Sequence, residues 1–277
     1  MFIPFGFMAG ASAAPPSYDT DAQAFFTAVE GGGDTLTTTE KDAVNQLVLD
    51  LKVGNEWNQS QWIYPFVGGT ASSMKWNLKN PVDTDAGYRL TFGTAMSFND
   101  KGIIGIGSNT QTFANTHYNQ ATNSDANGLV SLYLNQNMGA GGDNPNNWYD
   151  FGGYDGSKEM AFIMGYNNKT TMFSQWGTGG FLTAGSGWTY VNDLFTSMDD
   201  GTTLTMYQGT TSVVSTTQGF TPINLDLTIA GSNRTTGAQE TSGRGYGFAY
   251  YSNDVAGLSI SNLDSAVATF TTALSRN

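Results

Sequence analysis

The sequence predicts an all-β protein: an antiparallel β-sandwich with two short N-terminal helices and a C-terminal helix. Between about residues 62 and 258, apolar and polar residues alternate in many short runs, and turn-forming residues separate those runs. Helical spacing of apolar residues is confined to the two ends of the chain. Because no helical patterns alternate with the strand patterns, we expect the strands to pair antiparallel in two packed layers.

The composition agrees with this class. The chain has 277 residues, of which 39% are hydrophobic and 13% aromatic, enough for the core of one large sandwich. Only 12% of the residues are charged, about half the usual share. Polarity comes instead from Gly, Thr, Asn and Ser, residues that suit pleated surfaces and tight turns.

The first ten residues, MFIPFGFMAG, are apolar, but no Lys or Arg precedes them, and Pro4 and Gly6 interrupt the run. These features disfavour a secretory signal. We expect residues 1–17 to form an extended docking segment that binds a neighbouring subunit; the alternative is packing against the same chain. The residues expected at this assembly interface are Phe2, Ile3, Phe5 and Phe7.

Two short helices are predicted within residues 18–57. Residues 20–23, TDAQ, have capping-box spacing, and Gly31 provides a stop. Thr37 and Glu40 repeat the cap spacing, and Gly54 lies just past the end of the second helix. The apolar side of this second helix has the spacing i, i+3, i+4, i+7 and consists of Val44, Leu47, Val48 and Leu51.

Residues 58–277 are predicted to form the sandwich, including a closing helix over residues 262–275. Apolar residues at period two mark the strands: Leu90, Phe92, Val130, Leu132, Leu134, Met160, Phe162, Met164, Leu204, Met206, Leu225, Leu227, Ile229, Phe248 and Tyr250. Ser261 and Asp264 have the spacing expected of a capping box at the start of the closing helix. The apolar stripe of that helix is Leu263, Val267, Phe270 and Leu274.

The residue inventory excludes several kinds of chemistry. With no cysteine and with His117 as the single histidine, the chain cannot form a disulfide, a thiolate zinc site or a multi-histidine metal site. The formal net charge of −12 opposes nucleic-acid backbones and anionic bilayers, so neither nucleic acid nor membrane is an expected partner. The sequence also lacks the run of about 18 apolar residues that a membrane-spanning helix requires.

No catalytic motif is evident, and we expect no enzymatic activity. Asp155 and Glu159 have the spacing of a jelly-roll glycosidase pair, but Ser157 stands where a helper acid is expected, so a charged hairpin is the favoured interpretation. His117 has no orienting acid nearby in the sequence, and no Gly-x-Ser-x-Gly elbow is present. Residues 102–107, GIIGIG, lack the lysine of a phosphate-binding loop.

Candidate ligand-binding side chains gather between residues 143 and 154. Asp143 and Asp150 belong to an Asn-rich loop whose oxygens could hold calcium, although such loops are common without metal; no other cofactor is expected. Trp148, Tyr149 and Tyr154 surround Asp150 and two glycines. Exposed rings beside a carboxylate hold neutral sugars by stacking and hydrogen bonding, but the same rings could fill the core or a subunit interface.

The last third of the chain carries a family likeness. In residues 199–234, Leu204, Tyr207 and Gly209 follow a strand pattern of the type L-x-x-Y-x-N-G, with Gln208 in place of the usual Asn and one residue fewer between the Tyr and the Gly. Residues 247–274 combine an apolar strand, the tripeptide Gly-Leu-Ser and a capped helix. This part of the chain resembles the concanavalin A-like and laminin-G-like jelly rolls, which implies the same kind of β-sandwich.

Three further stretches are DTDAQAFF at residues 19–26, IYPFVGGTASSMKWNLKNP at residues 63–81 and YRLTF at residues 88–92. With the closing helix, they resemble virion structural proteins of tailed bacteriophages that contain such a jelly roll. The resemblance implies a non-enzymatic fibre, tail or head-surface component of the virion. It would assemble with other virion proteins through its N-terminal segment, as a homo-oligomer such as a trimer, and adhere to host glycans. The alternatives are a carbohydrate-binding lectin module and a jelly-roll glycoside hydrolase.

Overall fold

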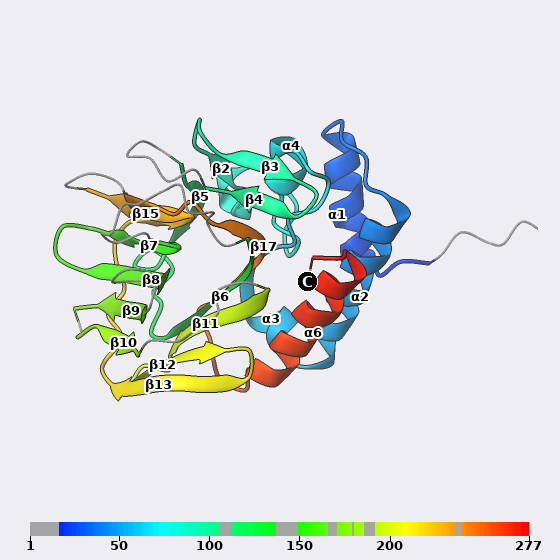
Figure 1. Ribbon diagram of the computed structural model, residues 1–277. Helices are drawn as coiled ribbons and strands as arrows, with labels where there is room; N and C mark the ends of the chain where they lie inside the picture. The colour runs from blue at the N-terminus through cyan, green and yellow to red at the C-terminus, as the bar shows by residue number, and fades with distance from the viewer. Residues whose placement is uncertain are drawn as a thin grey trace, which may run out of the picture.

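Two stacked β-sheets and one layer of helices make up the protein (Figure 1). The structure is a computed structural model that describes residues 17–105, 112–136, 149–165, 171–178, 180–185, 192–235 and 240–276. The predicted β-sandwich with helices at its two ends is confirmed. Among the described helices, none combines the length and apolar character that a membrane crossing requires.

The two N-terminal helices are α1, Thr20–Gly31, and α2, Thr38–Val53. The predicted cap of α1 was one residue late, because the side chain of Asp19 caps the helix by accepting a hydrogen bond from the Asp21 N–H at 3.0 Å. The predicted capping box of α2 is confirmed. The Glu40 N–H donates to Thr37 Oγ1 at 3.2 Å, and the Thr37 N–H donates to Glu40 Oε2 at 2.8 Å.

The closing helix α6, Ile260–Ala273, begins two residues earlier than predicted. Its cap is Ser259, whose hydroxyl accepts a hydrogen bond from the Asn262 N–H at 3.2 Å, so the predicted cap at Ser261 and Asp264 was wrong. The consequence is that the Asp264 carboxylate is not used as a cap. Three short helical segments were not predicted: α3, Glu56–Gln59; α4, Ala71–Met74; and η1, Asp85–Gly87.

Sheet A has eight strands in the order β13-β12-β11-β6-β17-β4-β3, with β1 also paired to β17. Their bounds are β1 Ser60–Tyr64, β3 Ser97–Asn99, β4 Gly102–Ile104, β6 Gly128–Gln136, β11 Asp193–Asp199, β12 Thr203–Gln208, β13 Thr211–Thr217 and β17 Gly245–Ser252. Every pairing described in this sheet is antiparallel, as predicted.

Sheet B has nine strands, seven of them in the order β10-β9-β8-β7-β14-β5-β2. Their bounds are β2 Thr91–Phe92, β5 Ala114–Asn119, β7 Phe151–Tyr154, β8 Glu159–Gly165, β9 Thr171–Gly177, β10 Leu182–Ala184, β14 Asp226–Ile229, β15 Gly231–Arg234 and β16 Glu240–Thr241. One pairing departs from the prediction: β15 runs parallel to β7, with Arg234 opposite Tyr154.

The main core lies between the sheets. The predicted alternation is confirmed on β6 and β8, whose inward residues are Val130, Leu132, Leu134, Met160, Phe162 and Met164. An aromatic stack crosses this core. The ring of Trp62 lies 4.9 Å from that of Tyr64 and 5.4 Å from that of Tyr251, measured between centroids.

A second core lies between sheet A and the helices. It joins Leu129, Tyr133, Leu194, Phe248 and Tyr250 of the sheet to apolar residues of α1, α2 and α6. Strand β17 is therefore buried along its whole length, since Ala249 and Tyr251 face the main core while Phe248 and Tyr250 face the helices. Sheet A is the middle layer of the molecule, and the helices cover its outer face (Figure 1).

Candidate functional site

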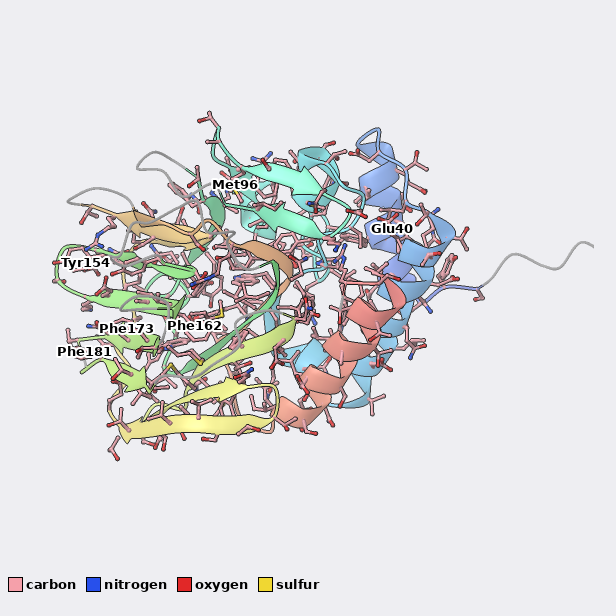
Figure 2. The ribbon with its side chains drawn as sticks, in the orientation of Figure 1. Glu40, Met96, Tyr154, Phe162, Phe173 and Phe181 are labelled. Atoms are coloured by element: carbon pink, nitrogen blue, oxygen red, sulfur yellow. The ribbon has the colours of Figure 1, made fainter. Side chains whose placement is uncertain are left out.

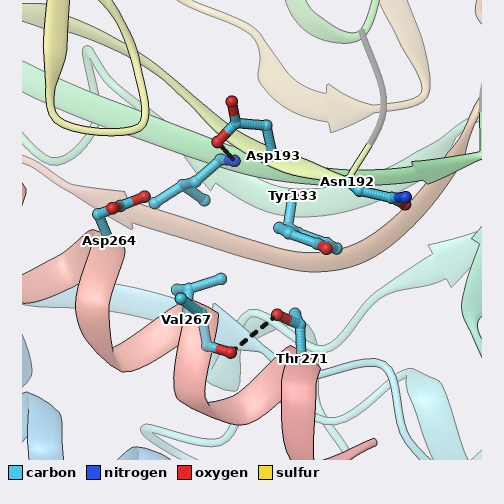
Figure 3. Close-up of a pocket in the computed structure, with 8 residues that line it drawn as sticks. Tyr133, Asn192, Asp193, Asp264, Val267 and Thr271 are labelled. Carbon is cyan, nitrogen blue, oxygen red and sulfur yellow. Dashed lines mark hydrogen bonds between the residues drawn. The ribbon is translucent and has the colours of Figure 1, made fainter. Parts of the chain in front are cut away.

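A pocket of about 240 Å³ opens between helix α6 and sheet A. Figure 3 shows the Asp264 side chain rising from α6 toward Asp193, with the Tyr133 ring lying between helix and sheet. The pocket is lined by Tyr133, Asn192, Asp193, Leu194, Asp264, Val267, Ala268 and Thr271. None of these eight residues is basic, so the pocket is rich in hydrogen-bond acceptors.

Helix α6 forms one wall. Because the helix starts after Ser259, its apolar stripe of Leu263, Val267 and Phe270 packs in the second core. Asp264 and Thr271 directly follow Leu263 and Phe270 in the sequence, and this places them over the start of β11. A fixed helix start therefore determines where the carboxylate points.

The C-terminal end of α6 is held by Arg276, whose guanidinium is buried. It donates to the carbonyl oxygens of Pro65 and Gly247 at 3.2 and 2.8 Å, and to those of Phe66 and Asp100 at 2.8 and 2.9 Å. Burial without a bonded carboxylate lowers the pKa of Arg276 to about 10. These four contacts fix the helix against the loop after β1, strand β17 and the turn between β3 and β4.

Sheet A forms the other wall. Asn192 has the left-handed φ of 56°, which asparagine tolerates, and its N–H donates to the Leu134 carbonyl at 2.6 Å. The chain then enters β11 at Asp193. One Asp193 oxygen accepts from Gln208 Nε2 at 2.8 Å, and the other from the Leu194 N–H at 2.9 Å. Tyr133 is the β6 residue paired with Leu194 and lies at the base of the pocket.

The two carboxylates converge beside Gly209, the turn residue between β12 and β13. A methyl group added to Gly209 would lie 3.5 Å from Asp193 Oδ1 and 3.6 Å from Asp264 Oδ1. Partial burial, and then the nearby Asp193 carboxylate, raise the pKa of Asp264 above its usual value. A ligand with hydroxyl or ammonium donors would relieve both effects, because it would supply hydrogen bonds to the charged form.

Asp150, predicted as a sugar or calcium ligand, is fully buried in the structure. One carboxylate oxygen accepts from Ser242 Oγ and Tyr246 Oη, at 3.0 and 2.5 Å. The other accepts from Arg244 Nη1 and the Met164 N–H, at 2.5 and 2.6 Å. Each oxygen thus accepts two hydrogen bonds from protein groups, and no part of the side chain is exposed. This full occupancy argues against either ligand-binding role and makes Asp150 part of a buried ion pair with Arg244.

Two of the predicted aromatic residues, Tyr149 and Tyr154, lie apart from the pocket, on the outer side of sheet B. Tyr149 is buried, and its hydroxyl donates to Glu159 Oε1. Tyr154 is half-buried, and the Arg234 guanidinium lies 5.6 Å from the Tyr149 ring and 4.9 Å from the Tyr154 ring. Figure 2 shows Tyr154 on the same side of the molecule as Phe173 and the exposed Phe181, whose rings stack.

The other predicted site residues lie outside the described part of the chain. These are Trp148, Asp143 and the four N-terminal residues Phe2, Ile3, Phe5 and Phe7. Within the described residues, no group of three or more acidic or histidine side chains is placed to hold a metal ion. Calcium binding by the loop around Asp143 therefore stays a prediction.

Two residue groups considered for catalysis are also placed. Asp155 and Glu159 occupy the β7–β8 hairpin, and Asp155 accepts hydrogen bonds from the turn amides of Ser157 and Lys158. His117 is half-buried, and acids distant in the sequence flank it: Nε2 lies 3.4 Å from Asp85 and Nδ1 lies 3.9 Å from Asp226. The absence of an orienting acid near His117 therefore holds for the sequence but not for the fold.

Sequence reasoning missed the pocket residues Asn192, Asp193 and Asp264. The spacing of Asp264 from Ser261 predicts a helix cap, and Asp193 stands 71 positions earlier in the chain. The one available signal is the Asn192-Asp193 pair ahead of an apolar strand. The pair indicates a polar residue where the strand begins, but it does not indicate which side chain elsewhere in the chain lies beside it.

Comparison with protein-family models gives no match, and no curated protein matches the sequence. Solved structures do share the fold. One is Domain 4 of AbnA, a GH43 extracellular arabinanase from Geobacillus stearothermophilus, solved in complex with arabinotriose. It has a TM-score of 0.50 and 13% identity, over 75% of this chain and 98% of that one. A mutant Trypanosoma rangeli sialidase displaying trans-sialidase activity has a TM-score of 0.51 and 10% identity, over 91% of this chain and 38% of that one.

The chain is thus a β-sandwich of the kind found in these carbohydrate-active proteins, and it matches nearly all of the arabinanase domain but well under half of the sialidase. At 10 to 13% identity the likeness establishes the fold. The jelly-roll resemblance predicted from the last third of the chain is confirmed at that level.

Proposed function

We propose that this protein is a carbohydrate-binding β-sandwich and that the pocket between α6 and sheet A holds the sugar. The observation that carries the proposal is the convergence of Asp193 and Asp264 on one small pocket. Sugar hydroxyls are donors, and carboxylates accept from adjacent hydroxyl pairs. Asn192 adds an amide, and Tyr133 and Val267 add apolar surface for the C–H face of a ring.

The fold supports the same class of ligand. Domain 4 of AbnA, which this chain covers almost completely, was solved with arabinotriose, a short neutral oligosaccharide. The pocket volume of about 240 Å³ lies just below the roughly 300–1,000 Å³ of most ligand sites, so we expect it to hold a single sugar ring. Short neutral oligosaccharides, pentose-containing ones included, are therefore the first ligands to test.

The virion role remains a separate proposal. Neither structure compared above is a virion protein. Location in a phage particle, virion protein partners and a trimeric state therefore stay predictions from the sequence resemblance. A sugar-binding sandwich mounted on a particle would satisfy both interpretations, since adhesion to host glycans needs such a site.

Isothermal titration with oligosaccharides selected on a glycan array tests the site. We expect Asp264→Asn and Asp193→Asn each to weaken binding by about tenfold or more, about 1.4 kcal/mol per factor of ten. Asp50→Asn, a carboxylate on α2 away from the pocket, is the matched control and should leave affinity unchanged. Unchanged affinity in both pocket variants would contradict the proposal.

The pH dependence of binding gives a second readout of the same residue. The pKa of Asp264 is raised. As pH falls, its carboxylate therefore takes up a proton at a higher pH than an ordinary aspartate does. Protonation removes an acceptor from the pocket, and affinity should therefore decline as pH drops through that raised pKa. In Asp264→Asn this part of the pH dependence should vanish.

Hydrolysis is a second candidate function, favoured by the same two carboxylates. Glycosidases use a carboxyl group with raised pKa beside a second carboxylate, roughly 5–9 Å apart. We propose binding without cleavage, in line with the sequence prediction. Long incubation with the bound oligosaccharide should release no new reducing ends. Release that Asp264→Asn abolishes would establish the enzymatic alternative instead.

A further inference from the structure

The two carboxylates of the pocket between α6 and sheet A have no cationic partner. Asp193 accepts hydrogen bonds only from neutral groups, the Gln208 side-chain amide at 2.8 Å and the Leu194 N–H at 2.9 Å. No ion pair between described residues includes Asp193 or Asp264. Arg276, just past the end of α6, donates instead to four backbone carbonyls. The pocket therefore presents two negative charges that no described side chain neutralises.

One point beside Gly209 lies close to oxygens of both carboxylates. Gly209 has a left-handed φ of 53° in the turn between β12 and β13. For a methyl carbon built on this residue, the nearest described atoms outside the turn are Asp193 Oδ1 at 3.5 Å and Asp264 Oδ1 and Oδ2 at 3.6 and 3.8 Å. A small ligand group at this point would therefore be close to three carboxylate oxygens.

The chemistry of this point favours an ammonium group over a hydroxyl group. A hydroxyl offers one donor and no charge, whereas an alkyl ammonium offers three donors and a positive charge. Charge-assisted hydrogen bonds are roughly twice as strong as neutral ones. Both carboxylates are half-buried, so water screens their attraction for a cation less than it would on the open surface. A ligand carboxylate would instead add a third negative charge without a basic partner.

We propose that the pocket selects sugars by charge: it binds an amino sugar in preference to a neutral one and rejects an acidic one. The ammonium group of the amino sugar lies beside Gly209, against the carboxylates of Asp193 and Asp264. This inference rests on the proposed carbohydrate binding and names the class of sugar for that pocket. The formal net charge of −12 acts in the same direction over longer distances, because it attracts cations and repels anions.

Isothermal titration with two ring-matched series tests the charge preference. The first series is glucosamine, glucose and glucuronic acid, and the second is galactosamine, galactose and galacturonic acid. At a pH of about 6, an amine is protonated and an ordinary aspartate is ionised. In at least one series, we expect the amino sugar to bind about tenfold more tightly than the neutral sugar, and the acidic sugar more weakly than either. Added salt should reduce the preference, because it screens the attraction. No advantage of the amino sugar in either series would overturn the inference.

Variants locate the charge preference. Asp264→Asn and Asp193→Asn should each reduce the ratio of the amino-sugar to the neutral-sugar affinity severalfold, because each removes one negative charge from the pocket. Asp50→Asn changes the net charge equally but lies on α2, away from the pocket, and should keep the ratio unchanged. A ratio that survives both pocket variants would overturn the inference, because the cation would then bind elsewhere.

The outcome also separates this inference from the proposed function. If the charge preference alone is wrong, neutral oligosaccharides still bind, their affinity still depends on Asp193 and Asp264, and an ammonium group gives no gain. If the proposed function is wrong, no sugar of either series and no oligosaccharide of the glycan array binds at the pocket, and both proposals are overturned.

Discussion

At the scale of single residues, Asp150 illustrates how burial changes the role of a carboxylate. Its partner Arg244 is almost fully buried, and burial followed by the Asp150 charge raises the pKa of Tyr246 well above its usual value. Removing one member of a buried ion pair leaves the other charge uncompensated. The cluster therefore stabilises the junction of β7, β8 and β17 only while it is complete.

We accordingly predict that Asp150→Asn lowers the free energy of unfolding by about 3 kcal/mol, as measured by urea denaturation. Glycan affinity of the folded fraction should stay unchanged. The surface variant Asp50→Asn provides the reference for an aspartate outside the cluster. Loss of glycan binding with normal stability would instead restore Asp150 to the ligand-binding role predicted from the sequence.

At the scale of elements, the β7–β8 hairpin is closed by Asp155. One oxygen accepts from the N–H groups of Ser157 and Lys158, at 3.0 and 2.9 Å, and the other from the Asn224 N–H at 3.0 Å. Partial burial acts to raise the pKa of Asp155, but these backbone hydrogen bonds outweigh it and lower the pKa to about 2. Because the folded pKa lies below the usual 3.8, the ionised side chain stabilises the hairpin.

This stabilisation is present above pH of about 4 and is lost as pH falls toward 2. Asp155→Asn should lower the free energy of unfolding by about 1–2 kcal/mol at pH 7 and by almost nothing near pH 2. Urea titrations at several pH values give the difference. Ser157→Ala keeps the carboxylate and the three backbone hydrogen bonds but removes the hydroxyl that donates to Asp155, so it should retain most, though not all, of the pH dependence. A constant difference across pH would mean that the charge of Asp155 does not matter.

At the scale of the whole molecule, the two cores share sheet A and should unfold together. Phe270 of α6 packs on Phe248, with ring centroids 6.2 Å apart, and the other face of the same strand contacts the main core. Phe270→Ala should cost about 3 kcal/mol. Helix ellipticity and tryptophan fluorescence should shift by the same amount in urea. Separate transitions would show that the helical layer unfolds on its own.

The sequence predicts the sandwich well because period-two alternation needs no knowledge of partners, and it predicts the α2 cap because Thr37 and Glu40 satisfy each other. The start of α6 is different. Ser259 and Ser261 are both able to cap, and the choice is fixed by Glu56, whose Oε1 accepts from the Ser259 N–H at 2.9 Å across 203 positions. The pocket depends on that helix start and on the β6–β11 pairing, so its carboxylates could not be paired from the sequence.

Strand β17 has one more consequence, for the order of folding events. It pairs with β1, β4 and β6 and separates the two cores, yet its residues, Gly245–Ser252, follow all three of those strands in the chain. Neither apolar interface can close before that strand leaves the ribosome. Until then, the edges of β1 and β6 that pair with β17 remain unpaired, and unpaired strand edges favour association with other nascent chains. Completion of this one strand is therefore the step on which closure of both cores depends.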